Sequence, residues 1–459
     1  MSTKDIEIEA EEKQSVSRFL PEEKPLTLLR EIFELGLICI VFYGLLNWLP
    51  RGYFFDGNVR LQAILNLFQH GTITKMDYSY IGPIFSFPLF LIDKFDNIYR
   101  WWLERYNVVL CIVVFLIEYA LLRKRMNANI LRAFFLLFLL VSLYANQYKY
   151  FGGEVFTALL AGMGMLIAVL VTEWGGWIAM AIGVANTPAS LIAAGLVSLR
   201  YMVHRKRLRY ALIVLGAAGL IGFANWITRG SPLNGGYANQ SFNTPFILGL
   251  FSLFFASGKG LLFFMPALFL PVKNRLFQIE GENKEKVYLA YKLWMYFVAG
   301  LVLIYASWWA WDGGWFWGPR FFLFASIPAS FVLAVYLCNP SRLFIVNLLI
   351  LLLFAYTLWV AIAGALFDQG NLSTVCMANN YARHYLCNYQ PQYSVLWAPL
   401  ANHWPIPSHG FRYIALSLVV AFYLAIPTLL AMTKQAQAKL QETKANLPKL
   451  KVWLTAWRP

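Results

Sequence analysis

The chain has 459 residues, of which 59% are hydrophobic and 13% charged. A soluble chain of this length would carry roughly a quarter charged residues and divide into two or three cores, so the composition excludes a soluble protein and predicts an integral membrane protein. The net charge of +15 comes from short basic clusters between apolar runs, which is typical of membrane-topology signals and not of nucleic-acid binding.

Residues 1–30 are polar and have no apolar core followed by a small-residue cleavage site. We therefore expect a cytoplasmic N-terminal segment without a cleavable signal peptide. The apolar runs of 31–432 predict about twelve membrane-crossing helices, near 32–50, 106–122, 130–146, 155–171, 175–187, 188–203, 209–227, 246–271, 287–309, 321–337, 344–366 and 412–432. The fifth and sixth runs are short for a crossing.

If those two runs both cross, the basic clusters fall on the side of both termini, which the positive-inside rule assigns to the cytoplasm. These clusters are 123–125, 204–209, 273–275 and the basic tail, 433–459. The predicted fold is thus an all-α, polytopic transmembrane helix bundle. Its outer side receives the loops 51–105, 146–154, 228–245, 312–320 and 367–411, which hold most of the unusual polar residues.

The first outer loop contains a short amphipathic pattern, because Leu61, Ile64, Leu65 and Phe68 recur at helical spacing. Asp56 is the expected N-cap and Gly71 the expected stop of a helix lying flat on the outer membrane surface. Asp56 has two interpretations that remain open: it only caps this helix, or it removes a proton from an acceptor hydroxyl. In the second case Arg60, one turn on, would keep it ionised.

The same loop continues with Ile81-Gly82-Pro83 and Pro88, and these prolines predict a broken segment in place of a crossing. An aspartate-led helix ending in His70-Gly71 and followed by Ile-Gly-Pro resembles the first outer loop of GT-C glycosyltransferases, which take sugars from polyprenyl phosphates. Two later segments are similar to motifs of bacterial members: 251–266 (FSLFFASGKGLLFFMP) and 311–321 (WDGGWFWGPRF).

The resemblance covers about residues 30–340 and is to bacterial protein mannosyltransferases and aminoarabinose transferases. It implies a GT-C-like fold, a polyprenyl-phosphate sugar as donor, and a lipid, glycan or protein as acceptor. Many relatives place a second acid after the first aspartate, where this chain has Gly57, which weighs against a metal site built on adjacent acids. The one cofactor that the resemblance leaves open is a divalent metal, Mg²⁺ or Mn²⁺, near Glu154.

Cations are needed beside a leaving phosphate, because it gains negative charge as the sugar departs. Arg320, Lys259 and Arg229 are the candidates, and the alternative for each is an interfacial anchor. Trp315 belongs to a tryptophan-rich stretch that is either an aromatic belt at the lipid headgroups or a platform for a sugar. His70 is a substrate-binding candidate whose alternative role is to end its helix.

Cys376 and Cys387 lie in the loop that is expected outside the cytoplasm, where disulfides persist. A metal site is the competing use, but the loop has no Cys-x-x-Cys pair. We therefore predict a disulfide that shapes a cover over the site.

These features predict an inverting glycosyltransferase in the plasma membrane, with its active site facing the periplasm or exterior and Asp56 as base. The alternative is a transporter or flippase of a lipid-linked or small solute. Transporters often show internal repeats and ionisable groups at mid-membrane, whereas this sequence shows no repeat and concentrates its polar residues in the outer loops.

Overall fold

The computed structural model describes residues 24–52, 55–96, 100–236, 240–379, 381–408 and 410–456. Their regular secondary structure is all helical, with no β-strand among the described residues, which confirms the all-α prediction. The chain divides into two compact units, 1–40 and 41–459. Most of the expected N-terminal segment, 1–30, lies outside the described residues.

Twelve of the helices correspond in position to the predicted crossings. They are α2 (Lys24–Asn47), α6 (Tyr106–Leu122), α7 (Ala128–Leu140), α9 (Gly153–Leu170), α10 (Glu173–Asn186), α11 (Ser190–Arg205), α12 (Ala211–Arg229), α13 (Phe246–Phe255), α16 (Lys284–Tyr305), α17 (Ser326–Cys338), α18 (Phe344–Leu366) and α22 (Gly410–Ala456).

Seven helical segments in the described chain are long and apolar enough to cross a membrane. They are Leu103–Leu122, Gly153–Leu170, Leu208–Arg229, Lys284–Tyr305, Arg320–Cys338, Phe344–Leu366 and Gly410–Thr443. The helices α7 and α13 are apolar but shorter. The structure is therefore that of a helical protein with several membrane-length segments, and the figure of twelve crossings stays a prediction.

The clearest difference from the sequence expectation is a helix that the structure breaks. The predicted helix 246–271 is not continuous: α13 ends at Phe255, and a turn leads to α14 (Leu261–Phe264) and η3 (Pro266–Phe269). The turn is tight at Gly260, where a Cβ would lie 2.7 Å from the carbonyl oxygen of Ala256. The basic tail from 433 continues the last predicted crossing as one helix, because α22 runs without interruption to Ala456.

Glycines allow a close helix contact between α9 and α10. A Cβ at Gly176 would lie 2.2 Å from the backbone nitrogen of Ala168, and one at Gly164 would lie 2.6 Å from the carbonyl oxygen of Gly176. Small residues allow helix backbones in a bilayer to approach this closely. The contact brings the beginning of α9, which carries Glu154, beside the end of α10.

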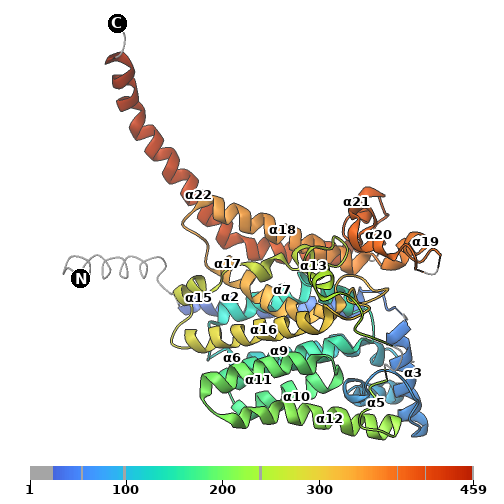
Figure 1. The fold of residues 1–459 in the computed structure, drawn as a ribbon. Helices are drawn as coiled ribbons and strands as arrows, with labels where there is room; N and C mark the ends of the chain where they lie inside the picture. Colours follow the sequence, from blue (N-terminus) through green and yellow to red (C-terminus); the bar gives the residue numbers. More distant parts are fainter. Residues whose placement is uncertain are drawn as a thin grey trace. The chain divides into compact units, whose positions relative to one another are not determined.

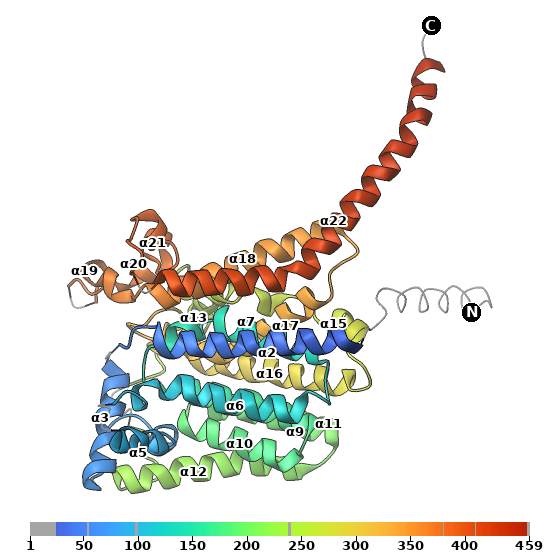
Figure 2. The ribbon, with the colours of Figure 1, turned by 180° about the vertical axis from the view of Figure 1, so that it is seen from behind.

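Figures 1 and 2 both place α3 (Phe55–His70), α5 (Phe87–Phe95) and α20 (His384–Tyr389) at one end of the long helices and α15 (Lys273–Ile279) at the other. The first and the last of the predicted outer loops thus share one end of the bundle. The basic cluster at 273–275 lies at the opposite end.

Candidate functional site

A cavity of about 530 Å³ opens among these loops. Its wall combines the first loop and α3, the beginning of α9, the α10–α11 turn, α12, the end of α16 and the loops 308–316 and 235–242. The polar and charged side chains of the wall include Asp56, Arg60, Asp77, Tyr78, Ser79, Glu154, Asn186, Thr187, Asn225, Arg229, Gln240, Tyr305, Arg320 and Tyr381. Segments far apart in the sequence therefore form one pocket.

The helix α3 positions Asp56. Leu61, Ile64 and Leu65 on one face of the helix are 0 to 3% exposed and belong to a hydrophobic cluster that includes Phe156 of α9. The opposite end is fixed by Gly71, whose φ of +67° confirms it as the helix stop. The buried stripe thus sets how α3 is rotated, and this rotation directs Asp56 toward the cavity.

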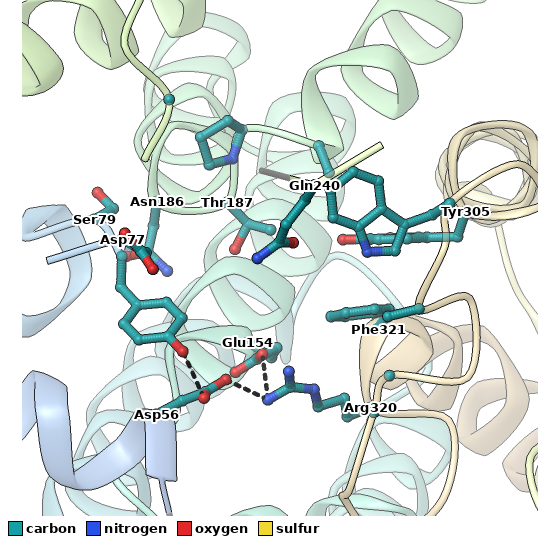
Figure 3. A pocket seen from close by; sticks show the side chains of 18 of the residues that line it. Asp56, Asp77, Ser79, Glu154, Asn186, Thr187, Gln240, Tyr305, Arg320 and Phe321 are labelled. Carbon is teal, nitrogen blue, oxygen red and sulfur yellow. Dashed lines mark hydrogen bonds and ion pairs between the residues drawn. The ribbon is translucent and has the colours of Figure 1, made fainter. Parts of the chain in front are cut away.

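Asp56 does not cap α3, so that prediction is wrong: it is the second residue of the helix, which begins at Phe55. Its carboxylate is held by two donors from other segments. Arg320 Nη1 lies 2.7 Å from Oδ2 and the Tyr78 hydroxyl donates to Oδ1 at 2.5 Å. Figure 3 shows Asp56, Glu154 and Arg320 pointing toward one another.

These donors decide the charge of Asp56. Burial alone would raise the pKa of its carboxyl, but the positive charge of Arg320, the hydrogen bonds from Tyr78 and Arg320, and the more weakly acting Arg60 together hold that pKa below 3.8. Asp56 is therefore ionised at neutral pH. Arg320, and not the neighbouring Arg60, is its direct counter-ion.

Glu154 in the first turn of α9 faces both guanidinium groups. Its Oε1 lies 3.7 Å from Arg320 Nη1 and its Oε2 lies 3.6 Å from Arg60 Nη1. The Arg60 guanidinium also stacks over the Tyr78 ring, 4.3 Å from its centroid. Two acids and two arginines thus form one cluster, with Tyr78 completing it.

Two N–H groups of these arginines form no hydrogen bond. Arg60 Nη1, which lies 3.6 Å from Glu154 Oε2, and Arg320 Nε are buried and have no hydrogen-bond partner among the residues that the structure describes. A buried N–H group without an acceptor is costly, and the negatively charged oxygens of a ligand could accept from such groups. The cluster therefore has the chemistry of an anion-binding site next to an ionised carboxylate.

The same geometry tests whether a metal ion fits near Glu154. Arg320 Nη1 lies within ion-pair distance of both Asp56 and Glu154, so a guanidinium is placed where a cation between these carboxylates would bind. No group of three His, Cys, Asp or Glu side chains suited to a metal occurs in the described ranges. The residues do not form a metal site in this arrangement.

Lys259 lies behind the pocket wall. Lys259 is buried, with 2% of its surface exposed. Its ammonium donates hydrogen bonds to the carbonyl oxygens of Gly314 at 3.1 Å and Gly318 at 3.3 Å, and to that of Phe316. These hydrogen bonds fix the backbone of the loop 313–319 (GGWFWGP). In this structure Lys259 acts on the shape of the loop that leads into Arg320.

The other predicted site residues fall in different places. Arg229 lines the cavity, but its Nη2 donates to the carbonyl oxygens of Met76 at 3.0 Å and Tyr78 at 3.1 Å, so it fixes the segment that carries Tyr78. Trp315 lines the cavity and is half-buried. His70 is exposed in the last turn of α3, away from this wall.

Three contributors escaped the sequence analysis. Tyr78 had no motif around it. Phe316 was seen only as part of an aromatic stretch, yet its ring lies 3.6 Å from the Arg320 guanidinium carbon. Asn186 lies at the end of the predicted helix 175–187 and belongs to no motif, but its side chain accepts from Gly82 N at 2.9 Å and donates to Gly153 O at 2.8 Å, joining the first loop to α9.

The last loop covers the turns behind the pocket. Cys376 and Cys387 form a disulfide with Cα atoms 6.0 Å apart, and Asn388 accepts a hydrogen bond from Gly258 N at 2.9 Å. Asn388 also donates to Asp312 at 2.8 Å. Tyr381, within the disulfide-closed segment, reaches the cavity wall.

Comparison of the chain with protein-family models, with curated proteins and with solved structures finds no match.

Proposed function

We propose that the chain is a membrane glycosyltransferase of the GT-C type, which moves a sugar from a polyprenyl phosphate to an acceptor hydroxyl on a lipid, glycan or protein at the outer face of the plasma membrane. The observation that carries the proposal is the Asp56–Arg320 ion pair, with its neighbours Arg60 and Glu154, at the wall of a 530 Å³ cavity. A twelve-crossing topology with the pocket outside is part of the proposal.

In the proposed reaction the Asp56 carboxylate accepts the proton of the acceptor hydroxyl. The hydroxyl oxygen forms a bond to the anomeric carbon while the bond from that carbon to the phosphate oxygen breaks, with inversion at the carbon. The phosphate leaves with the electron pair, and the proton passes from Asp56 to water. Tyr78 keeps the carboxylate oriented.

Arg320 would have two acceptors during this reaction. Before the donor binds, it pairs with Asp56 at 2.7 Å. Its unpartnered Nε, together with Nη1 of Arg60, could donate to the phosphate, and sharing the guanidinium charge with the phosphate would restore basicity to Asp56. This exchange would couple donor binding to activation of the base.

The test uses membranes from cells with and without the full-length chain, given a panel of radiolabelled polyprenyl-phosphate sugars. Transfer of label to extractable lipid, glycan or protein only when the chain is present supports the proposal. The rival flippase would instead move intact labelled lipid across vesicles without cleaving it. Label that stays on the polyprenyl phosphate while crossing the bilayer would replace the proposal with that rival.

A further inference from the structure

We propose that Trp315 and Tyr381 form a binding subsite for a carbohydrate ring at the edge of the cavity. The two side chains come from different loops, and both line the cavity. Tyr381 is 45% exposed and Trp315 half-buried, so their rings present free surface to a ligand. The inference deepens the proposed function and rests on it for the reaction, although binding can be measured without transfer.

His384 braces the two rings. The centroid of its imidazole lies 6.1 Å from that of Trp315 and 6.1 Å from that of Tyr381. Its Nδ1 is 3.4 Å from Asp312 Oδ2, and Asp312 accepts a hydrogen bond from Gly314 N at 2.9 Å. Both loops are thus tied to one buried carboxylate, and His384 is a positioning residue for the aromatic pair.

The backbone that presents Tyr381 is strained. Tyr381 has a φ of +68° and Asn379 one of +53°. Asparagine accepts this left-handed conformation readily, whereas a bulky residue such as tyrosine seldom does. The disulfide between Cys376 and Cys387 closes the segment around both residues. Strain of this kind persists where the surroundings impose it, and here it places an aromatic ring at the cavity.

A carbohydrate ring matches this surface. One face of a pyranose carries mainly C–H groups, which pack on aromatic rings, while its rim carries hydroxyls. The side-chain amide of Gln240 lines the same cavity and could exchange hydrogen bonds with such hydroxyls. A ligand of this class could be the sugar of the donor or a sugar of the acceptor.

The binding test needs no transfer activity. The purified full-length chain in nanodiscs is photolabelled with an octyl glucoside that carries a diazirine on the glucose ring. We expect label on the peptides that contain Tyr381 or Trp315, and competition by unlabelled octyl glucoside but not by octanol or adenosine. Trp315→Leu and Tyr381→Leu should each lower this labelling about five-fold. The matched controls Trp174→Leu and Tyr385→Leu, at exposed rings away from the cavity wall, should not.

Octanol or adenosine competing as well as the glucoside would overturn the proposal, as would undiminished labelling in both leucine variants. Where transfer is measurable, Trp315→Leu at saturating donor should raise KM for the acceptor if the subsite holds an acceptor sugar. At saturating acceptor it should raise KM for the donor if the subsite holds the donor sugar. A loss of kcat with both KM values unchanged would contradict a binding role. A failure of transfer alone would count against the proposed function and leave the photolabelling result standing.

Discussion

Arg320 and Asp56, which are 264 positions apart in the chain, are joined by an ion pair of 2.7 Å. The pair connects the first loop to the beginning of Arg320–Cys338, a membrane-length segment. Both side chains are about one-eighth exposed, at 12% and 13%. Each therefore depends on the other for charge compensation while keeping access to the cavity.

Replacing Arg320 tests its role beside the leaving phosphate. Arg320→Ala should lower the rate of sugar transfer by about 100-fold or more, because it removes a preorganised cation from a poorly solvated site. Arg320→Lys should restore only part of the rate, since an ammonium cannot donate from two fixed positions. Arg412→Ala, at an exposed position, is the matched control. Normal turnover in the alanine variant at normal protein levels would make Arg320 an anchor and not a substrate contact.

Lys259 should be a stability residue with an indirect effect on the site. Lys259→Met leaves the carbonyl oxygens of Gly314, Phe316 and Gly318 without their shared donor, and we expect a loss of about 1–3 kcal/mol in unfolding free energy. A lower midpoint of thermal unfolding in detergent would show it, with the exposed Lys75→Met as control. An unchanged midpoint combined with a raised donor KM would instead place the ammonium on the substrate.

The pKa of Asp56 predicts a pH dependence of stability. Its carboxyl has a folded-state pKa below 3.8, so the stabilisation is fully present above the unfolded pKa of about 3.9 and is lost as the pH falls through the lower folded value. The difference in unfolding midpoint between the parent and Asp56→Asn should stay constant from about pH 8 to pH 5 and shrink only below about pH 4. A difference that already shrinks between pH 7 and pH 5 would contradict a lowered pKa.

Most of the long helices could be predicted from the sequence because they coincide with apolar runs. An apolar run is recognised from residues that are neighbours in the chain, without knowledge of the tertiary structure. The amphipathic helix α3 and its stop at Gly71 followed from local spacing in the same way. The break after Phe255 could not be predicted from hydropathy, since the glycines of 256–260 lie within an otherwise apolar stretch. It depends on how the turn packs.

The site could be predicted only in part, for a related reason. Asp56, Arg60, Glu154 and Arg320 were identified as candidates, and the structure brings them together. Their pairing was not predictable from spacing. Arg60 is one turn from Asp56 but forms an ion pair with Glu154, whereas Arg320, which is distant in the sequence, forms the ion pair with Asp56. Tyr78 acts through one hydroxyl whose partner lies 22 positions away, and no local pattern marks such a contact.

The sidedness of the pocket is a separate prediction. With the free cysteines Cys39, Cys111 and Cys338 replaced, a single cysteine at the exposed Gln69 should react with an impermeant maleimide on intact cells. One at the exposed Lys124 should react only after the membrane is opened. The reverse pattern would turn the pocket toward the cytoplasm and remove the proposed outer-face reaction.

The most direct test of the account compares sugar transfer by the parent chain and Asp56→Asn, from the polyprenyl-phosphate sugar that the parent uses, with Asp96→Asn at an exposed loop position as control. Loss of a general base typically costs about 10²- to 10⁴-fold. We predict a fall of that size for Asp56→Asn at an equal level of folded protein, and parental transfer for Asp96→Asn. Equal transfer by the parent and Asp56→Asn would contradict the assignment of Asp56 as the base.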